Sequence, residues 1–125
     1  MCIHILTEPN ITEEDIIAYK ACTHQRNSEY IPTRRGAQKD YYKGILGTIL
    51  HYEKGTAVRS PIPETPGIYL FPDQITAHQY AGCCLKIVKV KIPKGATIFR
   101  GEVRWLRHDI IMLPTINASE ILVLE

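Results

Sequence analysis

Side chains that branch at Cβ make up a large part of this sequence. The chain has 125 residues, of which 18 are Ile, 5 are Val and 10 are Thr. Branching at Cβ restricts χ1 and suits a pleated surface, so this composition favours strands over helices. A chain of this length is typical of one domain and buries about two thirds of its unfolded surface. We therefore expect a small single domain (1–125) of the α+β class, with a twisted, mainly antiparallel sheet and one or two short helices.

Alternation of apolar and polar residues locates several of the strands. In segment 85–92, valine and isoleucine alternate with lysine, which is typical of a half-exposed strand. Residues 93–95 (Pro-Lys-Gly) predict a turn. Residues 97–104 predict a second strand, able to pair with the first as a hairpin. Three further segments are expected to be strands: 45–52, 68–71 and 121–124.

One helix has clear end signals. Asp73 is a suitable N-cap for residues 74–81, and Gly82 is a suitable C-terminal stop. The segment 59–67 contains three prolines, which donate no main-chain hydrogen bond to a neighbouring strand. We expect this segment to be an extended loop that leads into the strand at 68–71.

The N-terminal third is ambiguous. Residues 12–15 (Thr-Glu-Glu-Asp) are typical of the start of a helix, because acidic side chains favour the first turn. The following residues 16–22 fit either a helix or a strand, and both interpretations stay open. Residues 23–44 are mostly polar. A connection of this length in a small domain is either functional or ordered by a partner.

The charge balance argues against a dedicated nucleic-acid-binding domain. Fifteen Lys and Arg stand against 13 Asp and Glu, and residues 1–60 and 61–125 each carry a net charge of +1. The isoelectric point near 8.4 is lower than such domains usually have. No apolar run approaches the ~18 residues of a membrane span, and the first residues lack the pattern of a signal peptide. We expect a cytoplasmic protein without membrane contact.

The cysteines and histidines indicate no metal site. Cys2, Cys22, Cys83 and Cys84 form no pair with metal-ligand spacing, and the five histidines are scattered. Four reduced thiols are expected. The adjacent Cys83 and Cys84 would point to opposite faces if they lay on a strand. Phosphate-binding loops and the nucleophile motif of hydrolases are absent from the sequence.

A basic segment is the first candidate binding surface. Arginine forks suit phosphate groups, and the interleaved Tyr30, Tyr41 and Tyr42 could stack on bases or on a nucleotide. The alternative is a solvated loop whose charges only aid solubility. The basic residues of this set are Arg34, Arg35, Lys39, Lys43 and Arg59.

A second candidate surface surrounds the single tryptophan. Trp and Arg are common at the energetic centres of protein interfaces, so this cluster predicts an interface anchor. The alternative is a partly buried tryptophan that closes the core. The cluster consists of Arg100, Arg104, Trp105, Arg107 and His108.

Two segments resemble motifs of the ADP-ribosyltransferase family. Residues 67–71 (Gly-Ile-Tyr-Leu-Phe), followed by a helix over 77–81, resemble the strand and helix of that family's second motif. Residues 119–123 (Ser-Glu-Ile-Leu-Val) are similar to its last motif. The resemblance implies that Tyr69 stacks on the nicotinamide of NAD and that Glu120 is the catalytic carboxylate.

The first motif of that family is altered in this chain. Its counterpart, residues 19–21 (Tyr-Lys-Ala), has Lys20 in place of the family's His or Arg, and lacks the glycine that follows. A lysine cannot reproduce the planar, multi-point contact of an arginine. We therefore expect weak nucleotide binding and no efficient transfer from NAD.

The order of segments over 18–125 also resembles small phage and bacterial accessory domains, some of which counter host defence. This resemblance implies a phage-type protein that acts by binding in the host cytoplasm. Its most specific form is an anti-defence inhibitor of a host protein or nucleoprotein complex, or of a nucleotide-like signal, without a cofactor. One alternative is an ADP-ribosyltransferase-like enzyme that uses NAD. A second is a nucleic-acid-binding module that uses the basic segment.

Overall fold

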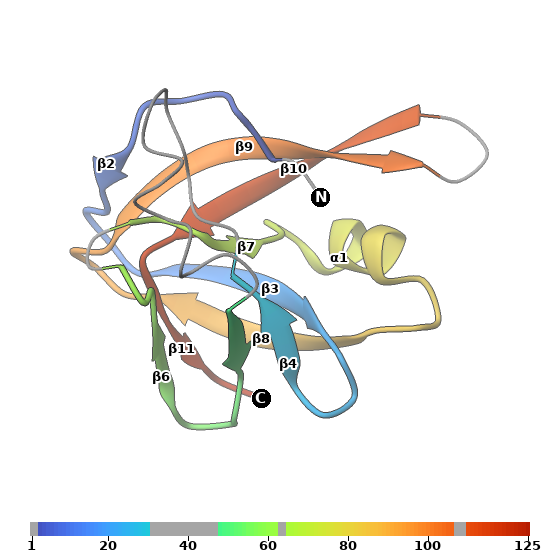
Figure 1. The fold of residues 1–125 in the computed structure, drawn as a ribbon. Coiled ribbons are helices and arrows are strands. Elements are labelled where there is room, and N and C mark those ends of the chain that lie inside the picture. The colour runs from blue at the N-terminus through green and yellow to red at the C-terminus, as the bar shows by residue number, and fades with distance from the viewer. Residues whose placement is uncertain (1–2, 31–47, 63–64, 107–109) are drawn as a thin grey trace.

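The computed structural model describes residues 3–30, 48–62, 65–106 and 110–125, with the main chain alone at 105, 106 and 110 (Figure 1). Within these ranges the chain forms eleven strands and one helix. Their bounds are β1 (Ile3–Ile5), β2 (Asn10–Ile11), β3 (Ile16–Cys22), β4 (Asn27–Glu29), β5 (Ile49–His51), β6 (Ala57–Arg59), β7 (Ile68–Leu70), α1 (Gln74–Ala81), β8 (Lys86–Ile92), β9 (Thr97–Leu106), β10 (Ile110–Ala118) and β11 (Glu120–Val123).

The strands form two main sheets, and every pairing in them is antiparallel. The first has the order β1-β9-β10-β7, with β2 also paired to β9. The second has the order β3-β8-β11-β6. A separate pair is formed by β4 and β5. The protein is therefore a small α+β domain with mostly antiparallel sheets and one short helix in the described ranges.

One main-chain bridge links the two sheets. Tyr19 of β3 and Phe71, just after β7, exchange two hydrogen bonds of 2.9 and 2.8 Å. In Figure 1, the long β9–β10 pair crosses above β3, β8 and β11, and α1 lies to one side. Helix α1 contacts β3, β8 and β10, so it also spans both sheets.

The apolar side chains form two clusters. The first lies mainly among the strands and includes Tyr30, Tyr52, Ile68, Val90 and Ile121. The second is formed where α1 packs on the sheets, and its buried members are Ala21, Phe71, Ala77, Ala81, Val103 and Leu113. Burial of such side chains is the main favourable term in folding.

The predicted helix is confirmed with both of its ends. Helix α1 spans Gln74–Ala81, and the Thr76 N–H donates a 2.7 Å hydrogen bond to Oδ1 of Asp73. At the other end, the Gly82 N–H donates to the His78 carbonyl at 2.9 Å, and Gly82 has a φ of 56°. The positive φ favours glycine at this position.

The prediction of a helix start at residues 12–15 is wrong. The Thr12 hydroxyl donates to the Pro93 carbonyl at 2.9 Å and accepts from the Ala96 N–H at 3.2 Å. A carboxylate oxygen of Asp15 accepts from the Lys94 N–H at 2.8 Å. These side chains hold a distant turn instead of capping a helix. The open choice for 16–22 is settled as strand β3.

The expected hairpin of residues 85–92 and 97–104 does not form. Both segments are strands, but β8 pairs with β3 and β11, whereas β9 pairs with β10, β1 and β2. The turn between them passes from one sheet to the other. Ile98 of β9 is buried in the first cluster.

Of the remaining expected strands, one is only partly within the described ranges and two lie close to their predicted positions. Segment 45–52 contains β5 (Ile49–His51), and residues 45–47 are outside the description. The strands β7 and β11 lie within one residue of their expected positions.

Candidate binding site

Tyr69, the residue expected to stack on a nicotinamide, lies inside the protein. It sits on β7 and is 6% exposed. Its hydroxyl is 3.1 Å from the Ser28 hydroxyl, and its ring meets the rings of Phe71 and Tyr80 edge-on, at centroid distances of 6.5 and 6.2 Å. The ring is therefore enclosed by side chains of the protein itself.

The face of the Tyr69 ring is covered by Lys20. The amine of Lys20 lies 3.1 Å from the ring centre of Tyr69 and 5.4 Å from that of Tyr52. It also donates a 2.9 Å hydrogen bond to the Tyr69 carbonyl. Lys20 is fully buried, so the two residues aligned with the family's first and second motifs contact each other in the core.

The environment of Lys20 opposes its positive charge. Burial lowers its pKa well below the usual value, while the nearby Cys22 acts in the opposite direction. The aromatic faces and the carbonyl favour the ammonium form, but removal from water is the larger effect. None of the carboxylates in the described ranges forms an ion pair with this amine.

Tyr52 adds an unsatisfied polar group to this region. Its side chain is fully buried, and its hydroxyl has no hydrogen-bond partner among the residues that the structure describes. Burial raises the pKa of this phenol, and the neighbouring Tyr69 and Cys22 raise it further. A buried hydroxyl without a partner costs about 1–3 kcal/mol, so the polar groups around Lys20 are incompletely matched.

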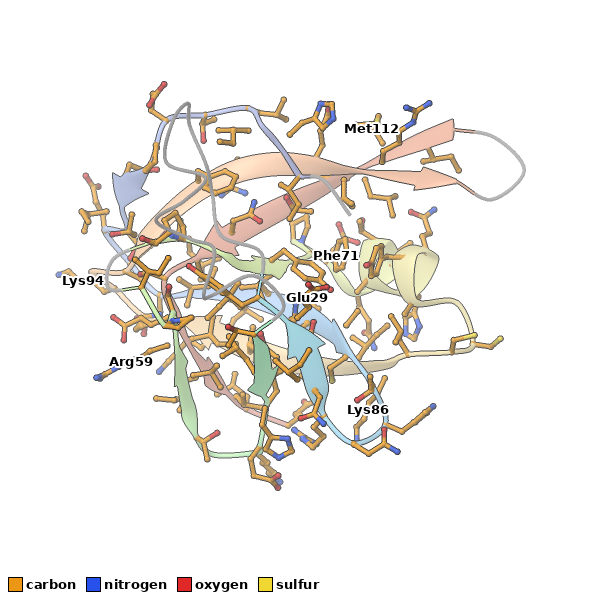
Figure 2. All side chains as sticks on the ribbon, viewed as in Figure 1. Glu29, Arg59, Phe71, Lys86, Lys94 and Met112 are labelled. Carbon is orange, nitrogen blue, oxygen red and sulfur yellow. The ribbon has the colours of Figure 1, made fainter. Side chains whose placement is uncertain are left out.

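Glu120, the expected catalytic carboxylate, lies at a different place. It begins β11 opposite Arg59 of β6, and its Oε2 is 3.5 Å from Nε of Arg59. Figure 2 shows Arg59 projecting outward from β6. Both residues line an open concavity of about 420 Å³. Its other lining residues are Ile11, Ser60, Gly95, Thr97 and Ser119.

A second open concavity adjoins the first through the exposed Ile11. It measures about 590 Å³. It contains the acidic Glu13 and Glu14 and the basic Arg100, and its remaining lining residues are Thr7, Asn10, Thr12, Ile16 and Ile98. The two concavities make a continuous surface of mixed charge and exposed apolar groups. We call it the β2 surface, because Asn10 and Ile11 form β2.

The structure thus separates the residues that were expected to act together in transfer from NAD. Lys20 contacts Tyr69 in the core, and Glu120 contacts Arg59 at the β2 surface. Neither Lys20 nor Tyr69 lines the concavity that contains Glu120.

The cluster around the tryptophan is only partly described. Arg100 and Arg104 are exposed on β9, and Arg104 lies opposite Met112 of β10. Trp105 lies opposite Ile111, and only its main chain is described. Arg107 and His108 are outside the described ranges, so the interface at this cluster stays a prediction.

Most of the basic segment is also outside the described ranges. This applies to Arg34, Arg35, Lys39, Lys43, Tyr41 and Tyr42. Tyr30 is described, and its ring is too buried to stack on a base or a nucleotide, as the sequence had suggested it could. It is buried in the first cluster, and its hydroxyl lies 2.6 Å from that of Ser60.

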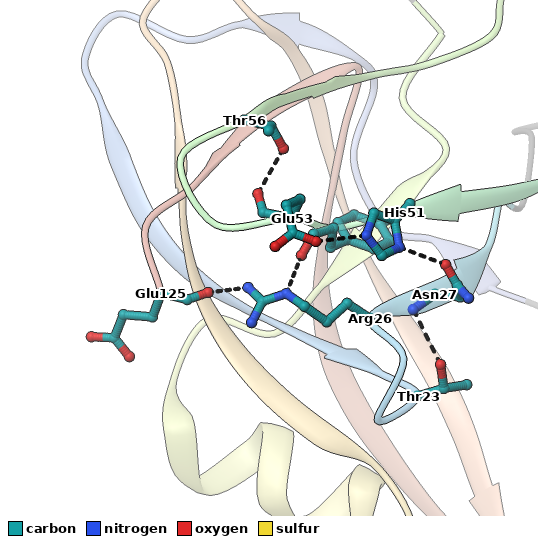
Figure 3. A network of polar contacts seen from close by, with 8 residues as sticks. Thr23, Arg26, Asn27, His51, Glu53, Thr56 and Glu125 are labelled. Atoms are coloured by element: carbon teal, nitrogen blue, oxygen red, sulfur yellow. Dashed lines mark hydrogen bonds and ion pairs between the residues drawn. The ribbon is translucent and has the colours of Figure 1, made fainter.

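A polar network fixes the β4–β5 pair to the end of the described chain (Figure 3). Arg26 donates through Nε to the Tyr52 carbonyl at 2.5 Å and through Nη2 to the Glu125 carbonyl. The ring nitrogens of His51 lie 2.8 Å from Oδ1 of Asn27 and 2.8 Å from Oε2 of Glu53. Both nitrogens of His51 are engaged, so this histidine helps to orient the β4–β5 pair.

Sequence reasoning missed two features. Tyr52 carries no local pattern that predicts its burial beside Lys20. Cys83 and Cys84 do not lie on a strand but in the turn before β8, with their sulfurs 3.9 Å apart, and the sequence did not predict this approach.

No family model, curated protein or solved structure matches this chain. In the described ranges, no three His, Cys, Asp or Glu side chains are grouped as metal ligands. The helix found there is too short and too polar to cross a membrane.

Proposed function

We propose that this protein acts by binding a partner and not by transferring ADP-ribose from NAD. The observation that carries this proposal is the contact between Lys20 and Tyr69. An amine 3.1 Å from the ring centre occupies the face on which a nicotinamide would stack. Transfer also requires the cofactor to be held and oriented beside a carboxylate, and Glu120 lies in a concavity that Tyr69 does not line.

The β2 surface is the proposed binding site, and a protein segment is the proposed ligand. Arg59 is partly neutralised by Glu120, and Glu13 and Glu14 add negative charge nearby. This charge distribution disfavours a nucleotide-like anion, because like charges repel across an interface. The exposed Ile11 surrounded by polar and charged groups resembles, on a small scale, the apolar centre and polar rim of a protein interface.

The most specific form of the proposal is an inhibitor of a host defence protein that works in the cytoplasm. It is supported by the resemblance of segments 18–125 to small phage and bacterial accessory domains. Binding by itself can block such a target, so this role needs no cofactor.

Charge reversal at the β2 surface tests the proposal. Tagged wild-type protein and an Arg59→Glu variant are used to capture proteins from a bacterial lysate, and the purified captured protein is then titrated against both. Arg59→Glu places two carboxylates side by side, and we expect at least tenfold weaker binding. Lys86→Glu, which makes the same change at an exposed site on β8, is the matched control and should bind like the wild type. Equal binding by all three proteins would exclude the β2 surface.

The transferase alternative has its own test. The protein is incubated with labelled NAD and bacterial lysate, beside a Glu120→Gln variant. We expect no label on any protein. Label that appears with the wild type and disappears with Glu120→Gln would establish the enzyme and overturn the proposal.

A further inference from the structure

Two adjacent thiols are exposed in the turn between α1 and β8. Gly82 ends the helix, and the Cys84 N–H donates a 3.3 Å hydrogen bond to the Ala81 carbonyl. Cys83 and Cys84 are both exposed, and their sulfur atoms lie 3.9 Å apart, within hydrogen-bond distance for sulfur. The binding function proposed above does not use this pair.

The position of the pair favours reaction with small molecules. Thiol–disulfide exchange requires access of the reagent to a thiolate. Both sulfurs are open to solvent, whereas Cys22 is buried and burial raises its pKa. The hydrogen bond with Cys83 raises the pKa of Cys84.

The geometry also determines what kind of disulfide the pair can form. The sulfurs must approach from 3.9 Å to about 2.0 Å, which side-chain rotation in an exposed turn allows. Adjacent Cα atoms lie about 3.8 Å apart. This is shorter than the usual Cα separation in disulfides, so the bond is strained and easily reduced. Such a bond is suited to reversible exchange and not to holding the fold together.

We propose that Cys83 and Cys84 form a reversible dithiol–disulfide site that reacts with low-molecular-weight disulfides such as oxidised glutathione. One thiolate attacks the glutathione disulfide, forms a mixed disulfide and releases one glutathione thiolate. The neighbouring thiol loses its proton to solvent and attacks the protein sulfur of the mixed disulfide. The products are the Cys83–Cys84 disulfide and a second glutathione thiolate, so the protein is oxidised by two electrons and glutathione is reduced.

Mass spectrometry of one peptide tests this proposal. Trypsin releases residues 60–86, which contain Cys83 and Cys84 and no other cysteine. The full chain with Cys2→Ser is treated with oxidised glutathione, free thiols are alkylated, and the protein is digested. We expect the wild-type peptide to be lighter by two hydrogen atoms and to carry neither glutathione nor alkyl groups. Reduced glutathione should restore both thiols.

The single variants provide the matched control. In Cys83→Ser and Cys84→Ser, the second step is impossible, so peptide 60–86 should keep one glutathione. A wild-type peptide that keeps glutathione like the variants would overturn the proposal, because the second thiol would then fail to displace it. A wild-type peptide with two alkylated thiols would overturn it as well.

Discussion

Lys20 lies on a strand whose neighbouring inward side chains are small or apolar. Ala18 and Cys22 share its face of β3, and all three are buried. The amine finds a carbonyl and two aromatic rings there, but no carboxylate in the described ranges. An amine buried without a carboxylate partner lowers the stability of the folded protein, because its charged form is poorly solvated there.

Replacing Lys20 by Met should stabilise the protein at neutral pH. The pKa of Lys20 is lower in the folded protein than in the unfolded chain, where it is about 10.4. Below about pH 10.4 the unfolded chain therefore binds a proton more readily than the folded protein does, which favours unfolding. This loss of folding stability is present at neutral pH and disappears as the pH rises through 10.4. The free energy of unfolding of Lys20→Met should therefore exceed that of the wild type at pH 7, with a gap that narrows by pH 10.5.

Urea denaturation at several pH values measures this gap. Lys89→Met, on the partly exposed face of β8, is the matched control and should show no comparable dependence on pH. A Lys20→Met protein that is less stable than the wild type at pH 7 would mean that the contacts of the ammonium outweigh its burial.

The sequence did not predict the environment of Lys20. The order of segments aligned Lys20 and Tyr69 with two family motifs, and the structure places them in contact. Their burial was not predictable, since it depends on Ser28 of β4 and on Tyr52, which directly follows β5. No local pattern in the sequence reports such contacts.

At the scale of single elements, α1 is defined by its ends. Asp73 accepts the N–H of Thr76, and this main-chain hydrogen bond lowers the pKa of the Asp73 carboxyl. Asp73→Ala should cost about 1 kcal/mol of stability at neutral pH, a typical loss for an N-cap.

The stabilisation by the Asp73 N-cap should also depend on pH, because the capping group is a carboxylate. Because the folded-state pKa is lowered, the stabilisation is present above the unfolded pKa of about 3.9 and is lost as the pH falls through the folded value. Asp73→Asn keeps a capping oxygen and should be more stable than Asp73→Ala at pH 7, without the change near pH 3–4. Thermal unfolding of the three proteins checks this, and equal stability of wild type and Asp73→Ala would contradict it.

Elements with local signals were predictable, whereas their partners were not. The helix was located from Asp73 and Gly82, and β8 from its alternating lysines. The pairing of β8 with β3 places Thr12 and Asp15 beside a turn some eighty positions away in the sequence, and both side chains form hydrogen bonds with it. Strands that follow each other in sequence often lie side by side, but β8 and β9 belong to different sheets, and no local pattern in either strand indicates this.

At the scale of the whole molecule, Phe71 connects the two sheets and the helix. Its main chain pairs with Tyr19, and its fully buried ring lies 4.9 Å from the ring of Tyr80, next to α1 (Figure 2). The ring belongs to the second cluster, which joins side chains of β3, β9, β10 and α1.

Phe71→Ala should destabilise the whole protein, by about 3–5 kcal/mol, the usual cost of emptying a large core site. Chemical denaturation measures this loss. Ile75→Ala, on the exposed side of α1, should change stability by no more than about 0.5 kcal/mol. If Phe71→Ala reduced the stability as little as Ile75→Ala, the ring of Phe71 would not be needed to hold the two sheets together.

The position of β11 has a consequence for synthesis on the ribosome. Residues Glu120–Val123 lie between β8 and β6, in the interior of the four-stranded sheet. Until Val123 has left the exit tunnel, β6 has no neighbour in this sheet and one edge of β8 stays open. Unpaired strand edges favour association with other chains. The nascent protein therefore completes its fold only after nearly all of this sequence has been translated, and a polypeptide that stops short of β11 exposes these edges to proteases and chaperones.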